Sequence, residues 1–176
     1  AVFILSHGRP DRVKTVKLLE KGNYTGEWYI VCDDEDETLP EYIEKYKDKV
    51  IVFSKEEAKD LFDLMDNTNE KKVVVYARNY IFKIAEDLEL THFIVLDDDY
   101  TDIHYVMLFK IGKEEMLMKK SKKVKSLDKL FEATFDLLDE TNALTIAYAQ
   151  EGDFIGGINS FMKKGFQRKA MNSFFF

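Results

Sequence analysis

Three consecutive aspartates, Asp97, Asp98 and Asp99, follow the apolar run Phe93–Leu96. The run predicts a buried strand, so the carboxylates stand at its carboxyl end, the edge where open α/β sheets bind ligands. Carboxylates crowded there repel one another unless a cation joins them. One interpretation is a hard divalent cation, Mg²⁺ or Mn²⁺, which bridges protein oxygens to the phosphates of a ligand. The other is an aspartate-rich turn that binds nothing.

A second candidate segment, Ser6–Pro10, follows the apolar run Val2–Leu5. Within it, Gly8 allows a ligand to approach the backbone closely. Arg9 can pair with phosphate or lie over a base, and an ordinary surface arginine is the alternative. If the strands are parallel, this segment meets the three aspartates at one edge of the sheet.

A third segment, Asp33–Glu37, follows the predicted strand Trp28–Cys32. Asp33 or Asp34 can accept hydrogen bonds from a ribose or from a base N–H. We interpret Glu35–Glu37 as an acidic loop that precedes a helix. The sequence therefore predicts Asp33 or Asp34 as a nucleotide ligand and gives Glu35–Glu37 no role.

Arg78 lies in the first turn of a helix predicted over residues 77–88. There it can reach a diphosphate with the help of the helix amides, or pair with a nearby carboxylate. The spacing of His7, His92 and His104 is not typical of a metal site, so we interpret all three as structural or surface residues. No Gly-x-x-x-x-Gly-Lys loop occurs, which argues against a P-loop NTPase.

Short strands and helices alternate along the first hundred residues, which predicts a mainly parallel sheet with helices on both faces. Capping-box spacing at Thr38/Glu41 and Ser54/Glu57 is typical of helix starts. After residue 100 the pattern changes to a hairpin around Gly112, a helix and a strand. We therefore expect an α/β fold with a mixed second half. The predicted strands are Val2–Leu5, Trp28–Cys32, Val50–Phe53, Phe93–Leu96, Tyr105–Ile111, Glu115–Lys119 and Ala143–Tyr148, and the main predicted helices are Asp11–Lys21, Ala77–Leu88 and Ser126–Glu140.

The composition predicts one domain over residues 1–176, because 176 residues with 45% hydrophobic content can bury one substantial core. Cys32 is the single cysteine, which excludes an intramolecular disulfide and fits a reducing, cytoplasmic compartment. No apolar run reaches membrane-spanning length, so we expect no membrane partner. The chain starts without Met inside a predicted strand and stops at Phe174–Phe176, so we expect a fragment of a longer protein. The oligomeric state cannot be predicted.

The formal net charge of −7 argues against broad, non-specific coating of nucleic acid. The lysines are nevertheless clustered, at residues 119–125 and again, with Arg168, at residues 163–169. We interpret the first cluster as a solvated face. For the second, a phosphate-facing surface and a solvated face both remain open.

Several of these motifs together resemble the GT-A glycosyltransferases. The resemblance rests on an Ala-Arg-Asn helix start at Ala77 and on the Asp-x-Asp element at residues 97–99. A narrower resemblance is to the TET-associated glycosyltransferases of phages and related genomes. The segments that carry it are Ser6–Pro10, Asp97–Tyr100, Ala149–Gly157 and Arg168–Ser173.

The resemblance implies a GT-A-like, Rossmann-like fold and the Mn²⁺- or Mg²⁺-dependent transfer of a sugar from a nucleotide-sugar, in the first place a UDP-sugar. The implied acceptor is the hydroxyl of a 5-hydroxymethylpyrimidine in DNA, with host cytoplasm as the location for a phage protein. The N-terminal half would bind the donor and the C-terminal half the acceptor. Asp99 would bind the metal directly, and Asp97 would touch the ribose or the metal. The implied donor residues are Ser6, Gly8, Arg9, Asp33, Arg78, Asp97 and Asp98, and the acceptor residues are Gln150, Gly152, Arg168 and Lys169.

The chain departs from the pattern of inverting GT-A enzymes, which commonly take their general base from a late Glu-Asp pair. No such pair follows Gly112. The base therefore lies elsewhere, or Asp153 serves as the catalytic base, or the enzyme retains configuration. The alternative functions are transfer to a glycan, lipid or protein, a sugar-nucleotide nucleotidyltransferase, and a non-catalytic nucleotide- or DNA-binding module.

Overall fold

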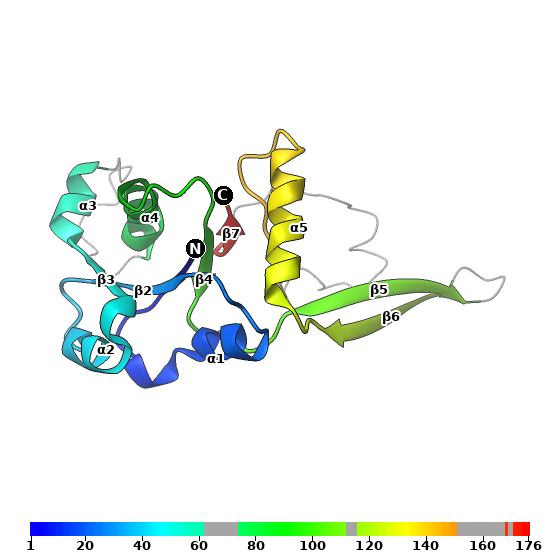
Figure 1. Ribbon diagram of the computed structural model, residues 1–176, viewed down its shortest axis with the longest axis horizontal. Helices are drawn as coiled ribbons and strands as arrows, with labels where there is room; N and C mark the ends of the chain where they lie inside the picture. Colours follow the sequence, from blue (N-terminus) through cyan, green and yellow to red (C-terminus); the bar gives the residue numbers. More distant parts are fainter. Residues whose placement is uncertain (62–73, 112–115, 151–167, 169–170) are drawn as a thin grey trace.

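A computed structural model describes residues 1–61, 74–111, 116–150, 168 and 171–176; for residues 107–111 and 116–120 it describes the backbone alone. Within these ranges no helix is both long enough and apolar enough to cross a membrane. Most of the described chain forms a sheet covered by helices, and a two-stranded hairpin extends away from this body (Figure 1).

The main sheet has five strands in the order β3-β2-β1-β4-β7. Its first four strands are parallel, and β7 pairs antiparallel with β4. The predicted α/β fold with a mostly parallel, Rossmann-like sheet is therefore confirmed. The strands are β1 (Val2–Leu5), β2 (Trp28–Asp33), β3 (Val50–Phe53), β4 (Ile94–Asp97) and β7 (Phe174–Phe175).

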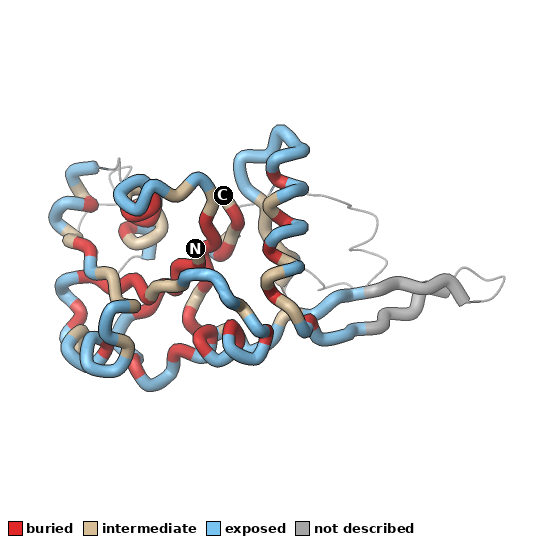
Figure 2. Tube along the Cα trace, viewed as in Figure 1, coloured by how far each residue is buried: buried red, intermediate tan, exposed pale blue. Residues whose placement is uncertain are grey.

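Helices cover both faces of the sheet. Successive side chains of β1 point to opposite faces, and because all of them are apolar, both faces must be buried. Val2 and Ile4 pack in one buried cluster with residues of α1, α2 and α5, whereas Phe3 and Leu5 pack with residues of α3 and α4. Figure 2 shows buried positions in the sheet and on the helix sides that face it. The helices are α1 (Lys14–Lys21), α2 (Leu39–Tyr46), α3 (Lys55–Leu61), α4 (Val75–Asp87) and α5 (Leu127–Asp139).

The predicted hairpin after residue 100 is confirmed as β5 (His104–Ile111) and β6 (Met116–Lys123). These strands pair antiparallel along their whole length and form a separate two-stranded sheet. The turn around Gly112 lies outside the described residues.

Two helix predictions are wrong in detail. The predicted helix over residues 11–21 is divided, because Val13 (ψ 79°) separates the 3₁₀ turn Pro10–Arg12 from α1. The capping box at Thr38 does not form, because the Thr38 hydroxyl donates to Asp36 instead of capping α2. At Ser54, by contrast, the hydroxyl accepts the Glu57 amide at 3.4 Å.

The predicted strand Ala143–Tyr148 is also wrong. Within this range only Ile146 makes a β-bridge, to Phe175. The place next to β4 belongs to β7, an antiparallel strand that the sequence did not predict. Phe175 is buried among Phe131, Phe135 and Tyr148. Phe174 and Phe175 therefore form the strand that borders β4.

Candidate functional site

The carboxyl ends of β1, β2 and β4 lie side by side, because Leu5 pairs with both Val31 and Asp97. The strand order reverses at β1, and the junction of β1 with β4 is the place where doubly wound sheets bind ligands. The segments after these three strands carry the predicted site residues. The structure therefore brings the three segments together at one edge.

Asp98 points into the protein. Its side chain is only 1% exposed, and its Oδ1 lies 2.9 Å from the Arg9 guanidinium. Its Oδ2 accepts a 2.6 Å hydrogen bond from the hydroxyl of Ser6. Tyr42 supports the same place, since its hydroxyl lies 2.6 Å from Ser6 Oγ and accepts the Arg9 amide at 3.1 Å. Asp98 thus ties the segment after β4 to the segment after β1.

Asp97 pairs with Arg78 of α4. Arg78 Nη2 donates to Asp97 Oδ1 at 2.8 Å, and its Nε donates to the carbonyl of Asn172 at 3.1 Å. Burial raises the pKa of Asp97, and the charges of Asp99 and Asp98 add to this effect while Arg78 opposes it. A further positive charge that approaches Asp97 would therefore stabilise its ionised form.

Asp99 is exposed, unlike its two neighbours, and lies close enough to Asp97 to influence its charge. Among the described residues, no group of three or more His, Cys, Asp or Glu side chains could hold a metal ion by itself. Mg²⁺ and Mn²⁺ at nucleotide sites take one or two carboxylates and complete their shell with phosphate oxygens and water. Asp97 and Asp99 together fit that kind of partial shell.

Gly8 brings its backbone to the same edge in a left-handed conformation, with φ at 71°. Its amide donates to Asp36 Oδ2 at 2.8 Å. A Cβ atom at Gly8 would meet nothing within 4 Å, so open space adjoins the backbone there. Asp36 Oδ1 accepts the amide and hydroxyl of Thr38. Burial alone would raise the pKa of Asp36, but these hydrogen bonds outweigh it and lower the pKa.

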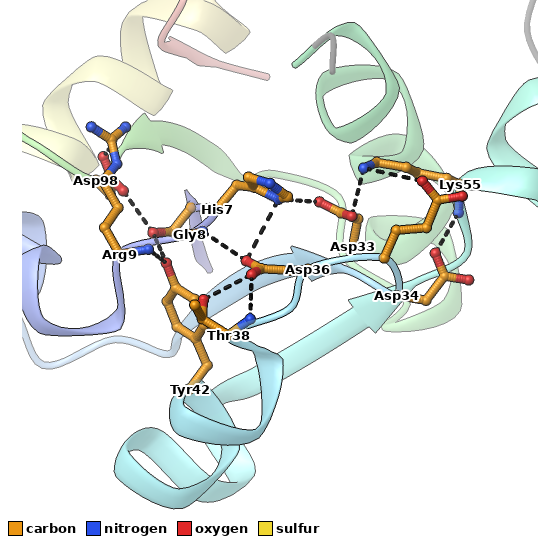
Figure 3. Close-up of polar contacts among 12 residues, drawn as sticks. His7, Gly8, Arg9, Asp33, Asp34, Asp36, Thr38, Tyr42, Lys55 and Asp98 are labelled. Atoms are coloured by element: carbon orange, nitrogen blue, oxygen red, sulfur yellow. Dashed lines mark hydrogen bonds and ion pairs between the residues drawn. The ribbon is translucent and has the colours of Figure 1, made fainter. Parts of the chain in front are cut away.

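His7, Asp33 and Lys55 form a chain of contacts beside this loop (Figure 3). His7 Nδ1 lies 2.7 Å from Asp33 Oδ2, and Lys55 Nζ lies 2.7 Å from Asp33 Oδ1. Asp33 is 8% exposed and Lys55 12%, whereas His7 is 60% exposed. Both oxygens of Asp33, the predicted nucleotide ligand, therefore contact protein groups, and the exposed member of the chain is the imidazole.

Of the predicted acceptor residues, the structure describes Gln150 and Arg168. Gln150 Nε2 donates at 2.7 Å to the hydroxyl of Tyr100, which lies 2.9 Å from Ser173 Oγ. Gln150 therefore lies next to the segment that carries Asp99. Arg168 is exposed. The other predicted residues of this side, Gly152, Asp153, Lys163, Lys164 and Lys169, lie outside the described residues.

Four residues that contribute to this edge were not predicted from the sequence. Asp36 carries a recognisable signal, because Asp-x-Thr is the spacing of an aspartate that bonds the backbone two residues on. His7 has only its place between Ser6 and Gly8 to mark it. Tyr42 and Lys55 give no local signal, since their partners are distant in sequence; Tyr42 and Ser6 are 36 positions apart.

Comparison with known protein families shows which family the chain belongs to. The family model described as TET-Associated Glycosyltransferase matches residues 1–176, the whole chain. The chain belongs to this family. The narrower resemblance, to the TET-associated glycosyltransferases, is thereby confirmed, and membership in this family implies a sugar donor and an acceptor. Neither the curated proteins nor the solved structures contain a match to the chain.

Proposed function

We propose that this glycosyltransferase moves a sugar from a UDP-sugar to the hydroxyl of a 5-hydroxymethylpyrimidine in DNA, with Mn²⁺ or Mg²⁺ as cofactor. The observation that carries the proposal is the pairing of Arg78 with Asp97 next to the exposed Asp99, at the sheet edge where nucleotides bind. Because the chain belongs to a glycosyltransferase family, the ligand that we propose for this edge is an activated sugar.

The donor's diphosphate is the part that needs positive charge. A bound cation would neutralise the diphosphate and stabilise it as the leaving group. Asp99 would hold that cation directly, with Asp97 beside it. Arg78 would keep Asp97 ionised and add a donor to the phosphates, and the open backbone at Gly8 would let the diphosphate approach.

The nucleoside of the donor would lie toward the end of β2. Since Asp33 contacts His7 Nδ1, the second imidazole nitrogen is the one left for a ligand. His7 would accept a hydrogen bond from the ribose or the base through this nitrogen. Asp33 would then act on the donor through His7, as a positioning residue, rather than by contact.

The acceptor assignment is supported by the resemblance and by the TET association in the family's description. Gln150, at the start of the acceptor segment, donates a hydrogen bond to the hydroxyl of Tyr100. Tyr100 directly follows Asp99 in the sequence. This contact favours an acceptor that approaches beside the cation. We retain Asp153 as the proposed general base for an inverting reaction, with a retaining reaction as the alternative.

The test is incubation with UDP-sugars, Mn²⁺ and duplex DNA that contains 5-hydroxymethylcytosine, followed by mass spectrometry of the digested nucleosides. We expect one added sugar mass on the modified base and stoichiometric release of UDP. Matched DNA without the hydroxymethyl group is the control and should stay unchanged. Pyrophosphate release would indicate a nucleotidyltransferase instead. UDP release with glycan, lipid or protein acceptors alone would overturn the DNA assignment.

A further inference from the structure

We infer that the β5–β6 hairpin docks duplex DNA by lying in its major groove; this inference rests on the DNA acceptor of the proposed function. The hairpin starts close to the site along the chain, because β5 begins at His104, shortly after Asp99. A hydrogen bond from the Val124 amide to the Ile103 carbonyl closes its base at 2.9 Å. From there the hairpin extends away from the sheet and its helices (Figure 1).

The hairpin is basic although the protein is acidic. Residues 104–125 contain seven lysines and two glutamates, in a chain whose net charge is −7. At the described root, Lys122, Lys123 and Lys125 are exposed, and Lys123 pairs with Asp102. Lysines in this arrangement complement phosphates, and the acidic remainder of the chain would keep DNA off its other surfaces. The lysine cluster interpreted above as a solvated face thus acquires a role.

The shape of the hairpin also fits a groove. Each strand has eight residues, and their pairing runs without interruption from His104↔Lys123 to Ile111↔Met116. Eight residues span about 26 Å, and two paired strands are about 5 Å apart. The major groove, about 12 Å wide, admits a two-stranded ribbon of this kind. Among the described residues, no other strand pairs with β5 or β6.

The chemistry of the acceptor selects the same groove. The 5-substituent of a pyrimidine projects into the major groove, where the methyl group of thymine lies. A ribbon in that groove would therefore run beside the hydroxymethyl groups. Because its first strand begins a few residues after Asp99 in the chain, the ribbon would bring the acceptor hydroxyl toward the proposed donor site. A second copy of this acidic chain also complements lysines, but it would not explain why the ribbon starts close to the site along the chain.

The test measures binding to a hydroxymethylated duplex by fluorescence anisotropy over a range of salt concentrations. The variant Lys122→Gln/Lys123→Gln/Lys125→Gln should bind at least tenfold more weakly than the parent. The slope of log affinity against log salt should fall by about two to three, roughly one per lysine removed. Lys122→Gln/Lys125→Gln, which preserves the Lys123–Asp102 ion pair, should show about two thirds of this change.

The matched control is Lys17→Gln/Lys21→Gln/Lys47→Gln, which removes the same charge from three exposed positions of the body. It should bind DNA within twofold of the parent. The Tm of each variant, with and without UDP-sugar and Mn²⁺, shows whether it folds and binds donor.

The outcomes separate the docking inference from the proposed function. If the parent glycosylates hydroxymethylated DNA and the hairpin variant binds it like the control, the docking inference is wrong and the proposed function stands. If the parent neither binds nor glycosylates the duplex, the DNA acceptor fails and the inference fails with it. Sedimentation that changes from dimer to monomer in the hairpin variant, with unchanged DNA affinity, would assign the hairpin to a second copy.

Discussion

Ser6 donates a 2.6 Å hydrogen bond to Asp98 and so joins the segment after β1 to the segment after β4. Asp98 is buried, whereas Asp97 is partly exposed and Asp99 is exposed. Three identical consecutive side chains therefore have three different surroundings. Asp98 holds the edge together, Asp97 pairs with Arg78, and Asp99 faces outward, so substitutions at the three positions should have different effects.

Asp98→Ala should lower the free energy of unfolding by about 2–4 kcal/mol, because it removes two short contacts and leaves Ser6 and Arg9 without their buried partner. Asp99→Ala should change the free energy by no more than about 0.5 kcal/mol, as expected at an exposed position. Denaturation in urea measures both values. Equal stability of the two variants would contradict a structural role for Asp98.

Arg78→Ala should move the acid limb of Mn²⁺-dependent donor binding to higher pH. Burial already raises the pKa of Asp97, and Arg78 is the group that opposes the rise. Cation binding needs the carboxylate, so a pKa raised further means that binding is lost earlier as the pH falls. Arg78→Lys keeps the charge and should shift the limb less.

The measurement for Arg78 is donor affinity as a function of pH between about 4 and 8. Affinity itself should fall at every pH, since Arg78 also faces the phosphates, so the midpoint of the acid limb is the informative quantity. In the Asp97→Asn background, where this position cannot titrate, Arg78→Ala should no longer move the midpoint. An unchanged midpoint in Arg78→Ala would show that Asp97 does not control binding.

Asp36→Asn should destabilise the protein at neutral pH by about 1–3 kcal/mol, because Asp36 accepts hydrogen bonds from Gly8 and Thr38. Its pKa is lowered in the folded protein. The carboxylate therefore adds stability above its unfolded pKa of about 4, and this stability is lost as the pH falls through the lower folded value. The gap between parent and variant should shrink on acidification, as urea denaturation at several pH values would show. A gap that does not depend on pH would be the contrary result.

His7→Ala should weaken binding of UDP by roughly tenfold, the equivalent of one hydrogen bond of about 1.4 kcal/mol. Binding of Mn²⁺-pyrophosphate, which lacks a nucleoside, should not change. Calorimetric titration measures both ligands. His92→Ala is the matched control, since His92 also pairs with an aspartate, Asp139, at 2.8 Å. Equal losses for UDP and pyrophosphate would exclude a nucleoside role for His7.

The sequence predicted the parallel part of the sheet because each strand is a short apolar run between turn residues. β7 could not be predicted in this way, since a two-residue strand such as Phe174–Phe175 is too short to show a period. The same reasoning also placed a strand at 143–148 from apolar content alone. Only tertiary pairing shows that β4 takes Phe174–Phe175 as its neighbour.

At the site, the sequence predicted the segments better than the roles of their residues. Polar side chains after strands mark an edge, so Ser6, Arg9 and Asp33 were found. Which carboxylate points inward depends on contacts between distant residues, such as Lys55 with Asp33. No local pattern distinguishes Asp98 from Asp99.

The most direct test of the proposed site is calorimetric titration of a UDP-sugar into the parent and into Asp99→Ala, with and without Mn²⁺. We expect the parent to bind the donor tightly only with Mn²⁺, and Asp99→Ala to bind at least tenfold more weakly with an unchanged Tm. Equal donor affinity in the two proteins, or parent affinity that does not depend on the cation, would contradict a cation-held donor at this edge.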